Sequence, residues 1–343
     1  MPKTTMPAAV RSLRSRRRGA GALIMAASLA LAACSSPSAP ADSASQAGSG
    51  PRLILFELSF PCGLNSYASQ LCAGVRAEAK ALPSGFRVEI KTGVNYSDVT
   101  AYNSLIQTST ELHPAGMILF VNGPAAQTPF INQACAQHIK MILIDSPATG
   151  VNRGCQSSFI GADHYQLGVE DGRWLIAHPP ADGSKQVGIV TQPPGEYAST
   201  DARVRGFTQT ITAAGYQVVA TAVTNLSLDT TRTEVTNMVT AHPDLGAIFS
   251  ANGAMGDGTE QALKNNHRIV QLTLDGFLND IPSIINGTIS ADAAQDPYAE
   301  GKTAVHYMAE VLQAKKVPSL TYTPSEVVTR QNAKAYLAVG GMH

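Results

Sequence analysis

A series of short polar side chains follows the apolar runs of this sequence, each near the point where its run ends. The series is Asn65 and Tyr67, Asn122, Asp145, Asn252, Asp275 and Gln295. Carboxylates accept hydrogen bonds and amides both donate and accept them, so this set has the chemistry to bind a polar small molecule. Taken singly, Asn and Asp are also favoured helix N-caps and turn residues. The series as a whole is therefore better evidence for a binding site than any one member.

Ten short apolar runs alternate with longer stretches that are compatible with helices. The runs occupy 53–58, 86–90, 116–121, 140–144, 158–162, 186–191, 217–223, 246–250, 269–274 and 288–294. Strand, helix and strand at this spacing predict βαβ units, and runs that are apolar on both faces are typical of parallel strands covered by helices on each side. Ligands of open α/β sheets bind beyond the carboxyl ends of the strands, which is where the polar series would lie.

The first 33 residues are typical of an export signal. Lys3 and five arginines at positions 11–18 precede an apolar run, Gly19–Ala33, whose one polar side chain is Ser28. A basic stretch before a short apolar run indicates a secretory signal, and crossing a bilayer takes about 20 apolar residues. An uncleaved anchor helix is the alternative interpretation.

The apolar run ends Leu-Ala-Ala-Cys at residues 31–34, which resembles a bacterial lipobox. Residues 1–33 are therefore expected to be a signal peptide, and Cys34 is expected to carry lipid that holds the protein at the membrane. Residues 34–50 are almost all Ser, Ala, Pro and Gly, the composition of a flexible tether. At about 100–200 residues per domain, the 310 residues from Cys34 onward predict two domains.

Charge and cysteine content agree with export. The chain has 25 basic and 25 acidic residues, but six of the basic ones precede Cys34, which leaves residues 34–343 with a net charge of −6. That balance argues against a nucleic-acid partner. Four further cysteines allow three pairings, of which short loops favour Cys62–Cys72 and Cys135–Cys155. Free buried thiols are the alternative, and the lack of a CxxC pair disfavours zinc. No metal or cofactor is expected.

Several segments together resemble the ribose-binding-protein-like substrate-binding proteins of carbohydrate ABC importers, which have the type I periplasmic binding fold. The segments include "VRGF", "AHPDLGAIFSAN", "LTLDGF" and "ISADAAQDPYAEG", and the resemblance covers roughly residues 52–340. It implies an α/β fold with two doubly wound parallel-sheet lobes joined by a three-strand hinge near 161–163, 295–297 and 324–326. The implied N-terminal lobe is 51–162 plus 296–324, and the C-terminal lobe is 163–295 plus 325–343.

The resemblance also implies which residues contact the ligand. Asn65 and Tyr67 match the Asn-x-aromatic loop after the first strand, and Arg203 matches the arginine four residues before the phenylalanine of Gly-Phe. Asn122, Asp145, Asn252, Asp275 and Gln295 match the remaining amides and carboxylates of the family site. Such a set suits a sugar, because each hydroxyl both donates and accepts hydrogen bonds. A structural ion pair or cap is the alternative for Arg203.

The chain departs from the family pattern in its aromatic residues. Tyr67 is followed by Ala68 where a second aromatic is common, and aliphatic residues stand near 226–228 and at Leu274. Tyr197 and Phe277 are candidate replacements. We therefore expect few apolar faces for stacking, which favours a pentose, a furanose or a polyol over a large pyranose.

The sequence thus predicts a monomeric, lipid-anchored receptor that delivers a small carbohydrate or polyol to an ABC-transporter permease, without catalysis. A sensor of the same fold, coupled to chemotaxis or signalling, is the first alternative. An exported hydrolase is disfavoured because no GxSxG motif, nucleophile with an evident base or metal-ligand spacing is present. A repressor of this fold would need a DNA-binding segment where the lipobox and tether stand.

Overall fold

The chain builds two parallel sheets in succession and then returns to complete both. The computed structural model describes residues 50–152, 154–264 and 266–342. The expected signal peptide, Cys34 and nearly all of the expected tether lie outside the described residues. Within the described part of the chain, no helix has the length and apolar character needed to cross a membrane.

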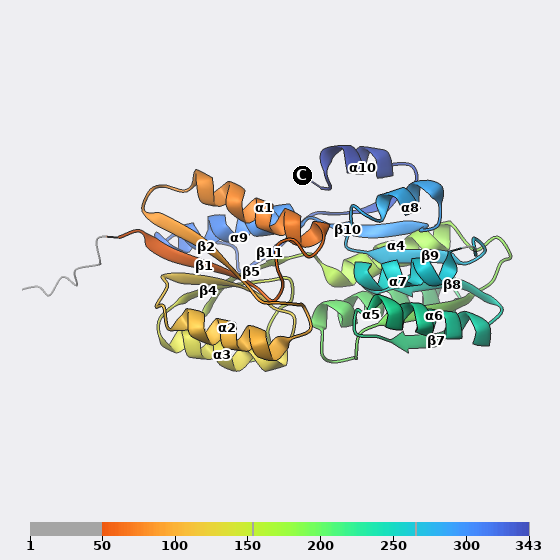
Figure 1. The fold of residues 1–343 in the computed structure, drawn as a ribbon, viewed down its shortest axis with the longest axis horizontal. Helices are drawn as coiled ribbons and strands as arrows, with labels where there is room; N and C mark the ends of the chain where they lie inside the picture. Colours follow the sequence, from red (N-terminus) through yellow and green to blue (C-terminus); the bar gives the residue numbers. More distant parts are fainter. Residues whose placement is uncertain (1–49, 153, 265, 343) are drawn as a thin grey trace, which may run out of the picture. The chain divides into compact units, whose positions relative to one another are not determined.

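The first sheet has six parallel strands. Their order across the sheet is β11 (Leu320–Tyr322), β5 (Gln156–Gly161), β4 (Lys140–Ile144), β3 (Gly116–Phe120), β1 (Arg52–Leu58) and β2 (Phe86–Thr92). Helices α1 (Ser66–Ala81) and α9 (Pro297–Leu312) pack together on one face, and α2 (Val99–Thr110) and α3 (Pro124–Ala136) on the other. Figure 1 shows this three-layered lobe. Strand β3 is buried throughout, as expected for a strand covered on both faces.

The second sheet repeats the arrangement with one difference. Its order is β12 (Ser325–Thr329), β10 (Ala291–Gln295), β9 (Val270–Leu274), β8 (Leu245–Ser250), β6 (Gln186–Thr191) and β7 (Gln217–Val223). Its helices are α4 (His164–Ala177), α5 (Ala198–Ala213), α6 (Leu228–Ala241), α7 (Gly253–Leu263), α8 (Ile281–Asn286) and α10 (Ala333–Val339). Strand β12 is antiparallel to β10, so this sheet is not wholly parallel.

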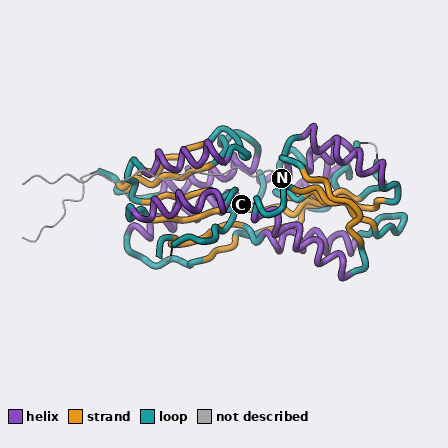
Figure 2. Tube along the Cα trace, turned by 90° about the horizontal axis from the view of Figure 1, so that it is seen from below, coloured by secondary structure: helices purple, strands orange, loops and turns teal. Residues whose placement is uncertain are grey.

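The ten apolar runs correspond to β1–β10, and the expected two-lobed α/β fold is confirmed. Strands β11 and β12 were not among the predicted runs, because their residues are short, half-polar and partly exposed. The chain passes from one sheet to the other three times, between β5 and α4, between β10 and α9, and between β11 and β12. Figure 2 shows the two layered bodies and the chain segments that pass between them.

Parallel register brings the carboxyl ends of the strands level with one another. In the first sheet Phe120 of β3 pairs with Ile144 of β4, so that Asp145 follows directly at the end of its strand. Polar residues then begin the helices. Asn65, Asp163, Asn252 and Asp296 each accept a backbone hydrogen bond as the N-cap of α1, α4, α7 and α9. Such caps are typically worth about 1 kcal/mol each.

Candidate ligand-binding site

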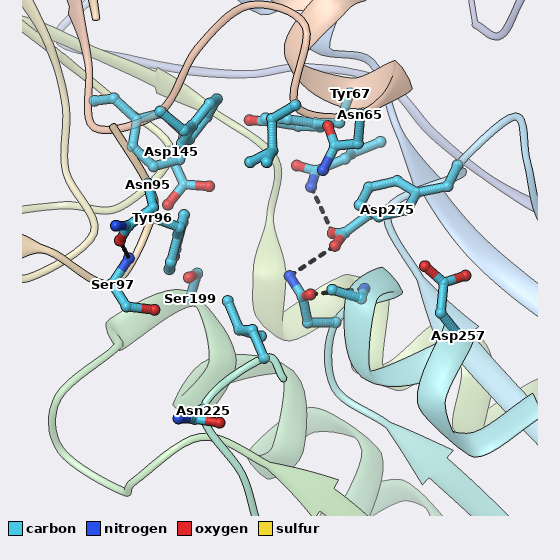
Figure 3. A pocket seen from close by; sticks show the side chains of 18 of the residues that line it. Asn65, Tyr67, Asn95, Tyr96, Ser97, Asp145, Ser199, Asn225, Asp257 and Asp275 are labelled. Atoms are coloured by element: carbon cyan, nitrogen blue, oxygen red, sulfur yellow. Dashed lines mark hydrogen bonds between the residues drawn. The ribbon is translucent and has the colours of Figure 1, made fainter. Parts of the chain in front are cut away.

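A cavity of about 590 Å³ lies where the carboxyl ends of the two sheets face each other. The first lobe contributes Phe60, Leu64, Asn65, Tyr67, Asn95, Tyr96, Ser97, Phe120 and Asp145 to its lining. The second lobe contributes Ser199, Arg203, Asn225, Leu226, Ser227, Asn252, Ala254, Asp257, Asp275, Phe277, Asn279 and Gln295. Figure 3 shows Tyr96, Ser97 and Ser199 at one end of this cavity and Asp257 at the other.

Seven of the eight expected contact residues line this cavity, and Asn122 does not. Asn122 is fully buried behind the wall, where its Nδ2 donates to the Tyr96 carbonyl (2.6 Å) and to Ser59 Oγ (3.3 Å). The structure thus places Asn122 behind the cavity lining, where its Nδ2 holds the loop that carries Tyr96.

Asp275 is the hub of the second-lobe wall. Its Oδ1 accepts from Arg203 Nη2 (2.8 Å) and Gln295 Nε2 (2.8 Å). Its Oδ2 accepts from Asn252 Nδ2 (2.8 Å) and from the Gly253 amide (2.9 Å). Figure 3 shows two of these bonds meeting at the carboxylate. An ionised carboxylate has about four acceptor positions, so these four bonds occupy Asp275 fully. Its role is to orient three other polar side chains.

Arg203 joins Asp275 to the hinge. It lies in the second turn of α5, somewhat beyond the expected helix start, and is 2% exposed. Its Nη1 donates to the Ala251 carbonyl (3.1 Å), and its Nε donates to His164 Nδ1 (3.2 Å). Since Nδ1 of His164 accepts this hydrogen bond, its Nε2 carries the ring hydrogen and donates to the Asp145 carbonyl at 2.8 Å. Burial lowers the pKa of His164 to about 3, which keeps the ring neutral.

The close packing of α4 against α5 determines the position of Arg203 relative to His164. A Cβ on Gly168 of α4 would lie 2.0 Å from the Arg203 carbonyl oxygen, and one on Gly206 of α5 would lie 2.1 Å from the Tyr165 carbonyl oxygen. The backbones of α4 and α5 are therefore in direct contact, which glycine alone permits. This contact fixes α5 against α4, the helix that begins with His164.

Asp145 differs from Asp275 in having acceptor capacity to spare. Its Oδ2 accepts from Ser146 Oγ (2.9 Å), and its Oδ1 lies 3.8 Å from His164 Nε2. The buried carboxylate of Glu300 in α9 accepts hydrogen bonds from the Asp145 amide (2.8 Å) and from the Tyr67 hydroxyl (3.2 Å). Asp145 is thus held by its backbone while its carboxylate remains open to hydroxyl donors.

Both aspartates occupy the left-handed region of the Ramachandran map. The φ angle is 66° at Asp145 and 89° at Asp275. Left-handed backbone costs a non-glycine residue on the order of 1–3 kcal/mol and concentrates at functional sites. Each strand end is therefore strained in a way that turns one carboxylate into the cavity, once in each lobe.

Aromatic rings form much of the remaining wall, so the expected scarcity of stacking faces is wrong. The rings that line the cavity belong to Phe60, Tyr67, Tyr96, Phe120 and Phe277. Of the two aromatic residues named as candidate replacements, Phe277 lines the cavity. Tyr197 is not part of the lining and stacks on Tyr96 from the second lobe. Phe60 follows the first strand and Tyr96 the second, so the strand-end rule extended to every run would have found both. Asp257 lies inside α7, where no such rule reaches it.

The cavity is acidic. Among its described lining residues, Arg203 is the one permanently charged cation, and it is paired with Asp275. The carboxyl groups of Asp145 and Asp257 are also in the wall. Nowhere in the described residues do three or more His, Cys, Asp or Glu side chains gather in a way that could hold a metal ion. The arrangement suits an uncharged ligand rich in hydroxyls and disfavours sugar acids and phosphates.

Two disulfides lie in the first lobe, with the pairing that short loops favoured. Cys62 is bonded to Cys72 with a Cα–Cα distance of 5.9 Å, and Cys135 to Cys155 with 5.5 Å. The first joins helix α1 to the loop that carries Phe60 and Asn65. It therefore braces one wall of the cavity.

Comparison with known proteins identifies the family. The family model described as periplasmic binding protein domain matches residues 56–316. The chain belongs to this family. The match includes every residue that lines the cavity, from Phe60 to Gln295, and ends before β11, β12 and α10.

Similar periplasmic binding proteins include sugar-binding members of known role. The ribose import binding protein of Bacillus subtilis is 26% identical over 270 residues, which are 78% of this chain and 84% of that protein. The D-allose-binding periplasmic protein of Escherichia coli is 23% identical over 268 residues, 76% and 85% of the two chains. A carbohydrate transporter solute binding protein from Agrobacterium radiobacter, solved with D-arabinose, shares the fold at a TM-score of 0.77 and 22% identity, covering 85% and 99%.

Ligand binding to this periplasmic binding protein should release a proton near neutral pH. Burial raises the pKa of Asp145 from 3.8 to about 7, against the opposing effect of Arg203. Hydroxyl donors favour the ionised carboxylate, so affinity should rise by up to about tenfold per pH unit below pH 7 and level off above it. Titration calorimetry at pH 6 in buffers of different ionisation enthalpy measures the released proton.

The raised pKa of Asp145 also makes the stability of the unliganded protein depend on pH, and here stability falls as pH rises. Between pH 3.8 and about 7 the unfolded chain ionises Asp145 while the folded chain does not, so this group's contribution to stability is lost as pH rises through that window.

In the binding experiment, Asp145→Asn should abolish the dependence of the binding heat on the buffer. Identical heats in all buffers for the wild type would contradict the assignment of Asp145 as the hydroxyl acceptor.

Proposed function

We propose that this periplasmic binding protein captures a small neutral carbohydrate between its two lobes and delivers it to the permease of an ABC importer. The observation that carries the proposal is the contrast between the two facing walls. On one wall the Asp145 carboxylate has acceptor positions that no protein donor fills. On the other wall Asp275 holds Arg203, Asn252 and Gln295 in place by hydrogen bonds. One wall offers acceptors and the other fixed donors and acceptors. A sugar ring with hydroxyls on both edges satisfies both walls at once.

The aromatic wall supports the same ligand class. A sugar ring has apolar C–H faces between its polar edges, and the rings of Phe60, Phe120 and Phe277 offer apolar surface beside the polar network. Because these faces are present, the earlier preference for a pentose over a pyranose no longer follows from the residues. The acidic lining favours neutral sugars and polyols of either ring size.

Closure of the lobes about the three chain crossings would trap the ligand. We take the lobes as 51–162 plus 296–324 and 163–295 plus 325–343, so that His164 and Asp296 lie at two of the crossings. Asp145 and Arg203 then belong to different lobes and are linked through His164. Ligand contacts on both sides would favour the closed state, since a ligand shifts an equilibrium only by its differential affinity.

A thermal-shift screen against neutral sugars, polyols, sugar acids and sugar phosphates tests the function. We expect a rise in melting temperature with one or a few neutral compounds, because binding at 100 times Kd stabilises by about 2.7 kcal/mol. Calorimetric titration of the best compound then gives its affinity. Stabilisation by sugar phosphates or acids in preference to every neutral sugar would refute the proposal.

Membrane attachment through lipid on Cys34 is part of the proposal. It rests on the lipobox-like end of the signal and the Ser, Ala, Pro and Gly stretch that follows it. Labelled palmitate should enter the wild-type chain, and Cys34→Ser should abolish labelling and release the protein from the membrane fraction. Serine keeps the size of the cysteine side chain and removes only the thiol. Ser35→Ala changes the neighbouring residue by one atom and leaves Cys34 intact, so it serves as the matched control and should be labelled like the wild type. Equal labelling of wild type and Cys34→Ser would disprove lipidation at this cysteine.

A further inference from the structure

Side chains, instead of the sheet, hold the backbone at Gly276, the residue that follows Asp275. The Asp275 amide donates to the Ala293 carbonyl (3.3 Å), so the pairing of β9 with β10 extends to this residue. Beyond it, the Gly276 amide donates to Asp292 Oδ1 (3.0 Å), and the Gly276 carbonyl accepts from the Tyr336 hydroxyl (2.9 Å). Two side chains from other parts of the second lobe therefore fix this residue, one at its amide and one at its carbonyl.

The backbone that these two bonds hold is strained. Asp275 and Gly276 are both left-handed, with φ angles of 89° and 67°. Such conformations persist only where the surrounding structure over-determines them. A Cβ on Gly276 would overlap the Tyr336 hydroxyl and lie 2.6 Å from Ala294 Cβ, so the turn is confined sterically as well. The direction of the Asp275 carboxylate therefore depends on Asp292 and Tyr336, and neither is among the described residues that line the cavity.

Helix α10 in turn fixes Tyr336. The buried residues Ala333 and Tyr336 lie one turn apart on this helix and share an apolar cluster with Ile281 and Ile284 of α8 and Val328 of β12. Figure 1 shows α10 beside α8, near the end of the chain. The Tyr336 side chain is 4% exposed, so its hydroxyl is held at the Gly276 carbonyl by the packing of its ring.

We propose that Tyr336 is a positioning residue of the ligand-binding site, which holds the Asp275 carboxylate in place through the Gly276 carbonyl and so makes the C-terminal helix part of that site. Asp275 orients three polar side chains of the same wall, so the effect of one hydroxyl extends to all of them. The proposal deepens the proposed function and rests on it only in taking this wall as the surface that meets the carbohydrate. Every group involved belongs to the second lobe, so the placement of the two lobes does not enter.

Nuclear magnetic resonance of the full chain without ligand tests the position of the carboxylate. Asn252 Nδ2 and Gln295 Nε2 both donate to Asp275, so their side-chain amide signals report where its oxygens lie. Tyr336→Phe removes the hydroxyl and keeps the ring, and it should shift both signals. It should also speed hydrogen exchange of the Gly253 amide, which donates to Asp275 Oδ2, by about fivefold, the effect expected when one hydrogen bond is lost.

Tyr216→Phe is the matched control, because it removes a buried hydroxyl from the same lobe. Tyr216 is 2% exposed, and its hydroxyl donates to the Leu175 carbonyl of α4 (3.4 Å) instead of to the Gly276 turn. This variant should leave the Asn252 and Gln295 signals and the Gly253 exchange rate at their wild-type values. Wild-type signals in Tyr336→Phe would overturn the proposal. Equal shifts in both variants would also overturn it, because they would show a general response to a lost core hydrogen bond.

A titration separates the role of Tyr336 from the choice of ligand. The neutral sugar that gives the largest thermal shift should bind Tyr336→Phe about two- to tenfold more weakly than the wild type and should bind Tyr216→Phe equally well. Wild-type affinity in Tyr336→Phe would overturn its role in binding even if the signals shift. If no sugar in the screen binds, the proposed function fails, while the side-chain signals still decide whether Tyr336 positions Asp275.

Discussion

Asp145→Ala and Arg203→Ala should each weaken carbohydrate binding by roughly thirtyfold to several thousandfold. Removing one charged partner of a buried hydrogen bond costs about 2–5 kcal/mol, and each ~1.4 kcal/mol is a factor of ten in affinity. Asp145 offers the open carboxylate of one lobe, and Arg203 is buried in the facing wall. Titration calorimetry with the sugar found by thermal shift measures both variants.

The two variants should differ in stability. Asp145 has one strong side-chain partner, Ser146, so its loss should leave the melting temperature of the unliganded protein close to wild type. Loss of Arg203 leaves Asp275 with a buried charge and fewer partners, so Arg203→Ala should also lower the melting temperature. Asp229→Asn, at a side chain 81% exposed, is the matched surface control and should change neither quantity. Binding by Asp145→Ala within twofold of wild type would remove Asp145 from the site.

Gly168→Ala should destabilise the second lobe by about 1–3 kcal/mol and weaken binding as well. The added Cβ would lie 2.0 Å from the Arg203 carbonyl oxygen and 2.8 Å from the Phe207 amide nitrogen, and both are backbone atoms that cannot turn aside. Helix α5 must therefore move away from α4, which carries Arg203 away from His164 and Asp275. Urea unfolding measures the stability, and calorimetry measures the affinity.

Gly85→Ala is the matched control for that variant, since a Cβ at this position meets nothing within 4 Å. Its unfolding midpoint and affinity should match those of the wild type. A Gly168→Ala protein with the wild-type midpoint would mean that the α4–α5 contact relaxes without cost.

The positions of the first ten strands and the strand-end polar residues could be predicted because both depend on local patterns. Runs such as 116–121 and 140–144 are apolar throughout, and a residue after the run, such as Asp145, must lie at the sheet edge whatever the rest of the chain does. Short half-exposed strands such as β11 carry no such pattern, since their position depends on pairing with β5 far away in the sequence.

The division of roles within the site depends on contacts between distant segments. Asn122, Asp145 and Asp275 are all short polar residues after strands, yet one supports a loop, one keeps free acceptors and one orients three side chains. What separates them is the number of partners each finds across the fold. Glu300 was missed for the same reason, because nothing in a helix beginning Pro297 indicates that its fourth residue reaches Asp145 and Tyr67.

The three crossings between the sheets have a consequence for the way this protein acquires its structure. The first lobe needs α9 and β11, which lie after residue 296, and the second lobe needs β12, which comes later still. Neither half can therefore finish folding while the chain is still emerging, and nearly the whole polypeptide must be present before either core closes. Many contacts join residues far apart in the sequence, as between α1 and α9, and such topologies fold slowly. A chain truncated after β10 would lose pieces of both lobes at once and leave no autonomous half behind.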